Sequence, residues 1–254
     1  ENLKRCAKQK NVDFLASAFD SESLDILEKN NVVAHKIASS ETSNIGFLNK
    51  VAQTGKPVLI STGMCDFIDI EEAINIMHSA NNFNICIMQC TSLYPLEYKD
   101  VNLNIIKSIL NRYETIAGFS DHTLDNIASF TAVGLGAKIF EKHITLNKKS
   151  KGPDHFYALE PQELKSYVDG IKKSFLCLGS PQKKLLDQEK EECRRESIYA
   201  AKDLKKNHLL SDYDLITKRP GIGIRSRYLK SIIGCKLKKD ISKNHPISFD
   251  DLTY

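Results

Sequence analysis

Two histidines stand where buried strands are expected to end. GFSDHTLDN (118–126) places Ser120, Asp121 and His122 directly after an apolar run, and FEKHI (140–144) places His143 in a similar position. Imidazoles at neighbouring strand ends can converge, and two neutral imidazoles supply part of a divalent-metal coordination sphere while leaving positions open. The pattern therefore suggests a catalytic metal at His122 and His143. The alternative is a pair of hydrogen-bonded loop histidines.

Small hydroxyl side chains recur at the other predicted strand ends, at Ser17, Ser39, Ser61 and Ser92. A hydroxyl group, together with the backbone N–H groups of a loop that enters a helix, can hold a phosphate or a carboxylate. Lys36 lies inside a predicted strand and points inward if Ile37 points outward. Because a buried lysine needs an anionic partner, the pattern suggests an anionic substrate. Solvated loop starts are the alternative.

The elements that position these residues alternate between strand and helix. Apolar runs, each followed by helical periodicity, occur at residues 12–17, 34–39, 57–62, 85–90, 115–120 and 138–144, and a helix is expected at 161–179. Such alternation implies a parallel sheet with helical crossovers. Six units fit a doubly wound sheet, or a (β/α)8 TIM barrel that lacks its first two strands in this chain. The N-terminus (ENLKRCAKQK) resembles the end of an amphipathic helix without an initiating Met, which favours the barrel.

The composition changes after residue 180. We predict a partial barrel domain over residues 1–180, a charged linker over 181–194 and a small domain over 195–254. The small domain contains a repeat, because 203–215 (DLKKNHLLSDYDL) and 240–252 (DISKNHPISFDDL) match 37 residues apart. We expect two pseudo-symmetric strand–turn–helix units, with His208 and His245 in solvated turns.

The overall composition disfavours several classes of protein. The net charge of +4 comes without a long basic block, so we expect neither a nucleic acid nor an anionic membrane as partner. The seven cysteines form no C-x-x-C pair, which suits reduced thiols in a cytoplasmic protein. No apolar run approaches the ~18 residues of a membrane helix, and the N-terminus does not resemble a signal peptide.

Seven motifs resemble those of the sialic acid synthases in order and approximate spacing: KIASSETSN, PVLISTGM, CTSLYP, GFSDHTLDN, FEKHITL, KGPDH and KRPGIGI. This family includes the N-acetylneuraminate, legionaminate and pseudaminate synthases. The resemblance implies a (β/α)8 barrel followed by an antifreeze-like (SAF) domain, and a homodimer in which each SAF domain covers the partner's barrel. It also implies a metal-dependent transferase that uses Mn2+, with Mg2+ or Co2+ possible. The reaction would condense phosphoenolpyruvate with N-acetylmannosamine or a 2,4-diacetamido hexose, giving a nine-carbon 2-keto acid and phosphate.

The resemblance also assigns roles to individual residues. Those expected to act in catalysis include Lys36, which would also contact phosphoenolpyruvate, and two carboxylates that would bind sugar hydroxyls. Asp121 is expected to orient its neighbours. The remaining assignments are His122 and His143 as metal ligands, Ser39, Ser61 and Ser120 as phosphoenolpyruvate contacts, Glu41 and Asp154 as the sugar-binding carboxylates with Tyr94 beside them, Ser92 as a further substrate contact that is Asn in some relatives, and Arg219 as the SAF-domain arginine that reaches the partner's N-acyl group.

Some expectations remain open at this point. The family also uses a Glu and a Lys at the ends of its first two strands, which this sequence lacks, so we expect a partial chain with weak or no turnover. A Schiff-base aldolase with Lys36 or Lys142 as nucleophile is one alternative function, and a non-catalytic sugar-phosphate-binding protein is another. GPDH followed by YALEP, together with DVNLN, leans toward the N-acetylneuraminate and legionaminate branch.

Overall fold

The computed structural model describes residues 1–192 and 194–253, which divide into two compact units, Glu1–Gly179 and Ser180–Tyr254. Position 193, inside the predicted linker, and the last residue, 254, lie outside the described residues. Within the predicted linker, the chain forms the short helix α8 (Asp187–Glu191).

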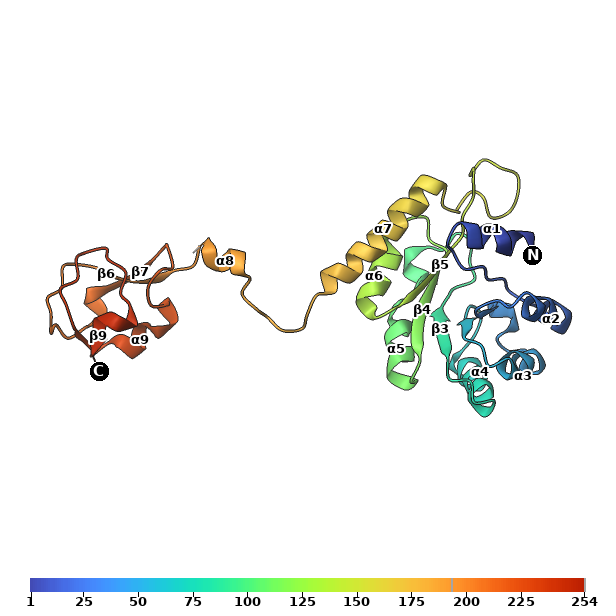
Figure 1. The fold of residues 1–254 in the computed structure, drawn as a ribbon, viewed down its shortest axis with the longest axis horizontal. Helices are drawn as coiled ribbons and strands as arrows, with labels where there is room; N and C mark the ends of the chain where they lie inside the picture. The colour runs from blue at the N-terminus through green and yellow to red at the C-terminus, as the bar shows by residue number, and fades with distance from the viewer. Residues whose placement is uncertain (193, 254) are drawn as a thin grey trace. The chain divides into compact units, whose positions relative to one another are not determined.

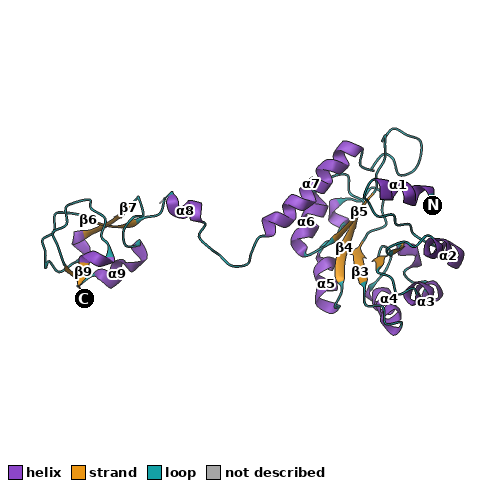
Figure 2. Ribbon diagram, viewed as in Figure 1, coloured by secondary structure: helices purple, strands orange, loops and turns teal. Residues whose placement is uncertain are grey.

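The first unit is a parallel sheet with helices along one face (Figures 1 and 2). The strands pair in the order β1-β2-β3-β4-β5, so each strand lies beside the next one in the sequence. The sheet curls into a half-barrel whose outer face carries the helices (Figure 1). The strands are β1 (His35–Ile37), β2 (Val58–Ser61), β3 (Ile85–Gln89), β4 (Ile116–Asp121) and β5 (Ile139–Lys142), and the helices are α1 (Asn2–Gln9), α2 (Ser21–Lys29), α3 (Ile45–Gln53), α4 (Phe67–Ser79), α5 (Asn104–Arg112), α6 (Ile127–Leu135) and α7 (Pro161–Leu178).

The α/β class and the strand–helix alternation are confirmed, but the first of the six predicted strands is wrong. Residues 12–17 make only an isolated parallel bridge, between Ser17 and Lys36. The other edge of this segment has no partner strand in the part of the chain that the structure describes, so no ladder forms there, and Val12 is 60% exposed. The described residues therefore form a five-stranded half-barrel rather than a closed eight-stranded barrel.

Successive side chains of each strand alternate between the face that the helices cover and the concave face. Ile37, Ile60, Ile87 and Phe119 belong to the main buried hydrophobic cluster beneath the helices. The intervening positions point to the concave face and include Lys36, which is paired in register with Leu59. This alternation delivers the polar residues of the strand ends to the inside of the curl.

Side-chain caps fix where several helices begin after these strand ends. Asp20 accepts a hydrogen bond from the Ser23 N–H at 2.7 Å at the start of α2, and Asn44 accepts one from the Phe47 N–H at 3.2 Å at the start of α3. Asp66 forms a capping box with Asp69 at the start of α4. Such caps satisfy N–H groups that have no partner within the helix, and so define the loops that carry the strand-end residues.

The second unit contains two antiparallel strand pairs around its own hydrophobic core. β6 pairs with β7, and β8 pairs with β9. The elements are β6 (Ser197–Ala200), β7 (Leu215–Lys218), α9 (Leu229–Ile232), β8 (Lys236–Leu237) and β9 (Leu252–Thr253).

The two sequence repeats fold alike and hold each other. The N–H groups of Leu204 and Ile241 each donate to the other's carbonyl at 2.8 Å. Asn207 and Asn244 adopt the same left-handed conformation, with φ of 65° and 66°. The predicted strand–turn–helix order is wrong in detail, because each helix is a single 3-10 turn (Asp212–Asp214 and Phe249–Asp251) and a strand follows it.

The two repeat histidines differ in their surroundings. His208 lies with its Nε2 2.9 Å from Asp214 Oδ2, so the prediction of a merely solvated turn is wrong for it, whereas His245 is exposed. Among the described residues, no helix combines the length and hydrophobicity needed to cross a membrane.

Candidate functional site

Two predicted site residues, Lys36 on β1 and Ser120 on β4, meet at Glu141 on β5. Lys36 Nζ lies 3.4 Å from Glu141 Oε2, and the Ser120 hydroxyl donates to Glu141 Oε1 at 2.8 Å. Ser120 and Glu141 are register partners across β4 and β5. Glu141 thus orients both the ammonium and the hydroxyl, and the sequence analysis did not single it out. Its place in the E-K-H strand end, two residues before His143, was the available signal.

Ser61, the last residue of β2, has a buried hydroxyl without a hydrogen-bond partner in the described residues. The residue is 2% exposed. Its backbone carbonyl is occupied by the Thr42 hydroxyl at 2.7 Å, which fixes the strand end. A buried hydroxyl left unpaired costs free energy, so Ser61 has hydrogen-bonding capacity that its described neighbours do not use.

Gly63 brings two further serines together. Its N–H donates to Ser39 Oγ at 2.9 Å. A Cβ at this position would lie 2.2 Å from Ser92 Oγ and 2.9 Å from Ser39 Oγ, so only glycine leaves room for both hydroxyls. Gly63 was missed as a site residue. The STG sequence at the end of a strand was the available signal.

The histidine pair lies at the same edge of the sheet. The His122 and His143 ring centroids are 5.4 Å apart, which confirms the predicted convergence of the rings. The Tyr94 ring packs against both, with its centroid 4.2 Å from that of His122 and 5.7 Å from that of His143. His122 Nδ1 lies 2.8 Å from the Thr91 carbonyl oxygen, so this nitrogen carries the proton. Burial lowers the pKa of His122, which keeps the ring neutral and its Nε2 lone pair available.

His143 has a different set of partners. Its Nδ1 lies 3.3 Å from the Tyr157 hydroxyl and 3.7 Å from Asp154 Oδ2. The Tyr157 hydroxyl in turn donates to Asp154 Oδ1 at 2.7 Å. Burial and the adjacent Asp154 carboxylate raise the pKa of Tyr157, so the phenol stays protonated. Tyr157 lies beyond the KGPDH motif, and nothing in the sequence distinguished it from a core tyrosine.

Asp121 points to the opposite side of β4, toward the helices. It accepts hydrogen bonds from the Ser129 hydroxyl at 2.6 Å and from the Thr123 N–H at 2.8 Å. Lys142 Nζ lies 3.1 Å from Asp121 Oδ2, and both side chains are almost completely buried. Burial is the main cause of the lowered pKa of Lys142. This geometry fits a supporting role for Asp121, next to residues that face the concave side.

Two further predicted site residues have their own surroundings. Glu41 accepts a hydrogen bond from the Asn44 side chain at 2.9 Å. Arg219 lies in the second unit, is exposed, and precedes a cis peptide bond to Pro220. No group of three or more His, Cys, Asp or Glu side chains is arranged to hold a metal ion within residues 1–192 and 194–253.

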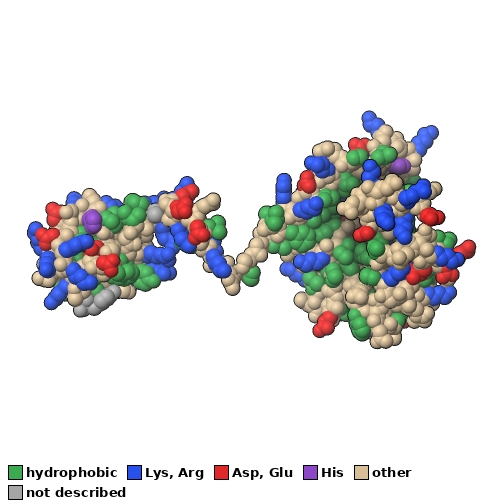
Figure 3. Space-filling view, in the orientation of Figure 1, with side chains coloured by type: hydrophobic (Ala, Val, Ile, Leu, Met, Phe, Trp, Pro, Cys, Tyr) green, Lys and Arg blue, Asp and Glu red, His purple; other side chains and the backbone are tan. Residues whose placement is uncertain are grey.

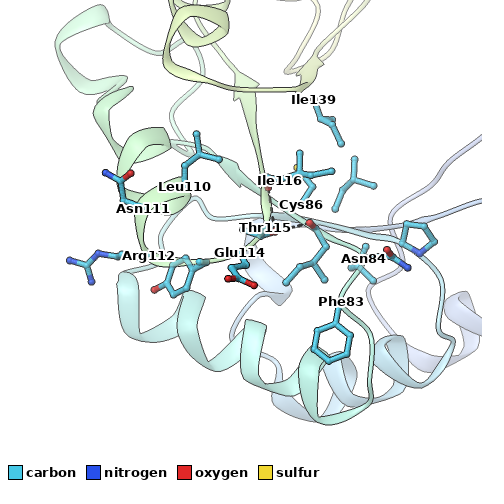
Figure 4. Close-up of a pocket in the computed structure, with 15 residues that line it drawn as sticks. Phe83, Asn84, Cys86, Leu110, Asn111, Arg112, Glu114, Thr115, Ile116 and Ile139 are labelled. Carbon is cyan, nitrogen blue, oxygen red and sulfur yellow. Dashed lines mark hydrogen bonds between the residues drawn. The ribbon is translucent and has the colours of Figure 1, made fainter.

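A separate cavity of about 860 Å3 lies at the opposite end of the strands (Figure 4). Its lining includes the first residues of β2 to β5, Val58, Ile85, Ile116 and Ile139. Hydrophobic side chains are also visible around β4 and β5 on the face that Figure 3 shows. This cavity contains none of the strand-end serines or histidines, so the chemistry-bearing cluster is distinct from it.

Comparison with known proteins agrees with the arrangement of two units. Residues 1–183 match the NeuB family, and residues 195–253 match the SAF domain. The chain belongs to the NeuB family.

Characterised relatives of this NeuB-family chain are synthases. It is 38% identical over 232 residues to the N,N'-diacetyllegionaminic acid synthase of Campylobacter jejuni, covering 90% of this chain and 70% of that protein. It is 32% identical over 252 residues to the pseudaminic acid synthase of Helicobacter pylori, covering 98% of this chain and 74% of that protein.

A solved structure gives the same result. The crystal structure of the N-acetylneuraminic acid (sialic acid) synthetase of Leptospira borgpetersenii, in complex with citrate, matches with a TM-score of 0.71 and 32% identity, covering 75% of this chain and 67% of that one. The resemblance to sialic acid synthases is therefore confirmed, and the NeuB-family chain belongs to the synthase class of enzymes with an SAF domain at its C-terminus.

Proposed function

We propose that this NeuB-family protein condenses phosphoenolpyruvate with an N-acetylated amino sugar, either N-acetylmannosamine or a 2,4-diacetamido hexose. The products would be a sialic-acid-type 2-keto acid and phosphate. We further propose that the five-stranded sheet is part of a (β/α)8 barrel, as the resemblance implies. The observation that carries the proposal is the unpartnered buried hydroxyl of Ser61, at the same sheet edge as Lys36 and the histidine pair.

The serine and lysine groups suit an anion that must be oriented. Lys36 supplies a positive charge, and the hydroxyls of Ser39 and Ser61 supply donors. The Ser120 hydroxyl donates to Glu141 here, so it would have to turn toward the anion to bind it. Holding phosphoenolpyruvate with its carbon 3 toward the histidine pair would convert a bimolecular reaction into one between positioned groups. We propose that Ser92 adds a further contact, because Gly63 brings its hydroxyl close to that of Ser39.

The histidine pair suits a divalent metal. His122 presents Nε2 as a lone pair because its Nδ1–H is held by the Thr91 carbonyl, and His143 lies beside it. Two nitrogen ligands leave positions open for substrate oxygen and water, and we propose Mn2+, with Mg2+ or Co2+ as substitutes. A bound divalent ion would supply Lewis-acid polarisation of the sugar aldehyde oxygen.

The protein's own groups would orient the remaining chemistry. Carbon 3 of phosphoenolpyruvate attacks the aldehyde carbon, water adds at carbon 2, and the tetrahedral intermediate expels phosphate. Asp154 and Glu41, with Tyr94 beside them, would bind sugar hydroxyls. We propose that the protein is a homodimer in which Arg219 of the SAF domain contacts the N-acyl group held by the partner's barrel.

A phosphate-release assay tests this function. The intact protein would be incubated with phosphoenolpyruvate and each sugar, with Mn2+ or with a chelator. Phosphate release that needs both substrates and stops with the chelator supports the proposal. Binding of phosphoenolpyruvate without release in the intact protein would favour a non-catalytic binder instead.

A Schiff-base aldolase is the second candidate, favoured by the lowered pKa of Lys142. The position of that lysine argues against it, because its ammonium is buried against Asp121 and the Thr123 carbonyl on the helix side of β5. Borohydride trapping of substrate on Lys142 or Lys36 would establish the aldolase and rule out the metal-dependent synthase.

A further inference from the structure

Tyr157 joins two predicted site residues through a single hydroxyl. This hydroxyl donates to Asp154 Oδ1 at 2.7 Å and lies 3.3 Å from His143 Nδ1. Tyr157 is 2% exposed, and its ring centroid lies 5.1 Å from that of His143. It is therefore held in place beside the imidazole by packing as well as by hydrogen bonds.

The backbone around Tyr157 is anchored to the end of β5. The Leu159 N–H donates to the His143 carbonyl at 2.8 Å, and the Thr145 N–H donates to the Leu159 carbonyl at 2.9 Å. The segment that carries Tyr157 thus pairs with the segment that carries His143. Movement of one relative to the other would break these bonds, so the contact between phenol and imidazole is part of the fold.

The number of protons decides which way each hydrogen bond runs. A phenol has one proton, and an ionised carboxylate can only accept. Because the Tyr157 proton goes to Asp154, the phenol oxygen faces His143 with a lone pair. His143 Nδ1 can then approach it only as an N–H donor, which leaves Nε2 unprotonated.

We propose that Tyr157 is a positioning residue that holds His143 in the Nδ1–H tautomer, so that its Nε2 lone pair is available to a divalent metal. The Thr91 carbonyl does the same for His122. The two imidazoles, with different partners, thus present the same nitrogen. Partners of this kind orient metal-binding histidines in general and typically change metal affinity 10- to 100-fold when removed. The metal part of this inference rests on the proposed function, whereas the tautomer part does not.

The test reads the tautomer directly in protein without metal or substrate. Nitrogen-15 NMR of the intact protein, at a pH well above the ordinary histidine pKa of about 6.5, distinguishes Nδ1–H from Nε2–H in each imidazole. We expect both His122 and His143 to be in the Nδ1–H form. In Tyr157→Phe, which keeps the ring, His143 should shift toward Nε2–H while His122 does not change.

A matched control is Tyr98→Phe. It also removes a tyrosine–aspartate hydrogen bond, from the Tyr98 hydroxyl to Asp125, at an exposed position. We expect this variant to leave the His143 tautomer unchanged. It should also leave Mn2+ affinity, measured by calorimetry, within twofold of the parent, whereas Tyr157→Phe should weaken Mn2+ binding 10- to 100-fold.

A second variant keeps the test decisive if Tyr157→Phe fails to fold. Asp154→Ala removes the acceptor of the phenol proton, so that the Tyr157 hydroxyl can donate to His143 Nδ1 and favour the Nε2–H tautomer. If His143 stays in the Nδ1–H form in every folded variant, the proposal is overturned. If the tautomer responds but the intact protein releases no phosphate from phosphoenolpyruvate, the positioning role stands and the proposed function fails.

Discussion

The Asp121–Lys142 pair gives a quantitative test of the support behind the site. In Asp121→Ala, the buried Lys142 ammonium would lose its carboxylate, and the Ser129 hydroxyl and Thr123 N–H would lose their acceptor. Removing one member of a buried ion pair costs about 3–5 kcal/mol. In a unit of this size each kcal/mol lowers Tm by about 2–4 °C, so we expect the first unit to melt roughly 6–20 °C lower.

The assay is thermal and urea unfolding followed by far-UV circular dichroism, since the chain contains no tryptophan. Asp169→Ala is the control, because it breaks the exposed Lys165–Asp169 pair, which should be worth no more than about 0.5 kcal/mol. The double variant Asp121→Ala/Lys142→Met should be more stable than Asp121→Ala alone, since it leaves no unpaired charge. If Asp121→Ala costs no more than Asp169→Ala, the assignment of Asp121 as a buried support is wrong.

Three further predictions concern the anion-facing residues and the second unit. Ser61→Ala should leave the free energy of unfolding within about 1 kcal/mol, because its hydroxyl has no partner to lose, yet weaken phosphoenolpyruvate binding about 10- to 100-fold in calorimetry. Gly63→Ala should also weaken that binding, by more than tenfold in the same assay, because its Cβ would displace the Ser39 and Ser92 hydroxyls; unchanged affinity would contradict this. Hydrogen bonds with Lys202 and with Lys239, respectively, lower the pKa of Asp214 and of Asp251, despite opposing desolvation. The two ionised carboxylates should therefore stabilise the second unit fully at a pH above the ordinary aspartate pKa of 3.8. This stabilisation should be lost as the pH falls toward their folded-state pKa. Amide NMR signals of that unit should show unfolding at low pH, and the double Asp214→Asn/Asp251→Asn variant should already be destabilised at neutral pH, with a smaller further loss of stability on acidification.

The strand–helix alternation was predictable because short apolar runs alternate along the chain with segments of helical periodicity. This pattern is typical of a parallel sheet with helical crossovers. β1, β2, β3 and β5 fall within the predicted strand segments, and β4 extends one residue beyond its segment. Helix α7 falls within the predicted 161–179. Residues 12–17 have the same local composition as the observed strands, but strand formation requires hydrogen-bonding partners on the neighbouring chain segment. Local sequence does not record whether those partners are present.

The meeting of His122 and His143 followed from strand order alone, because neighbouring parallel strands end at the same edge of a sheet. Glu141, Gly63 and Tyr157 were not predictable in the same way. The contacts of Glu141 with Ser120 and of Gly63 with Ser92 join segments 21 and 29 residues apart, and they depend on distances of a few ångströms. The role of Tyr157 depends on the direction in which its hydroxyl points. Whether these residues act in catalysis stays a prediction.

The reciprocal bonds between Leu204 and Ile241 join the two repeats of the second unit through their backbones. In a polypeptide that contains only one repeat, the N–H and carbonyl groups of Leu204 or of Ile241 would lack these partners and would bond to water instead. Two such fragments, from one molecule or from two, could satisfy each other in the same way. The similarity of the two segments in the sequence thus corresponds to a pairing between them in the structure.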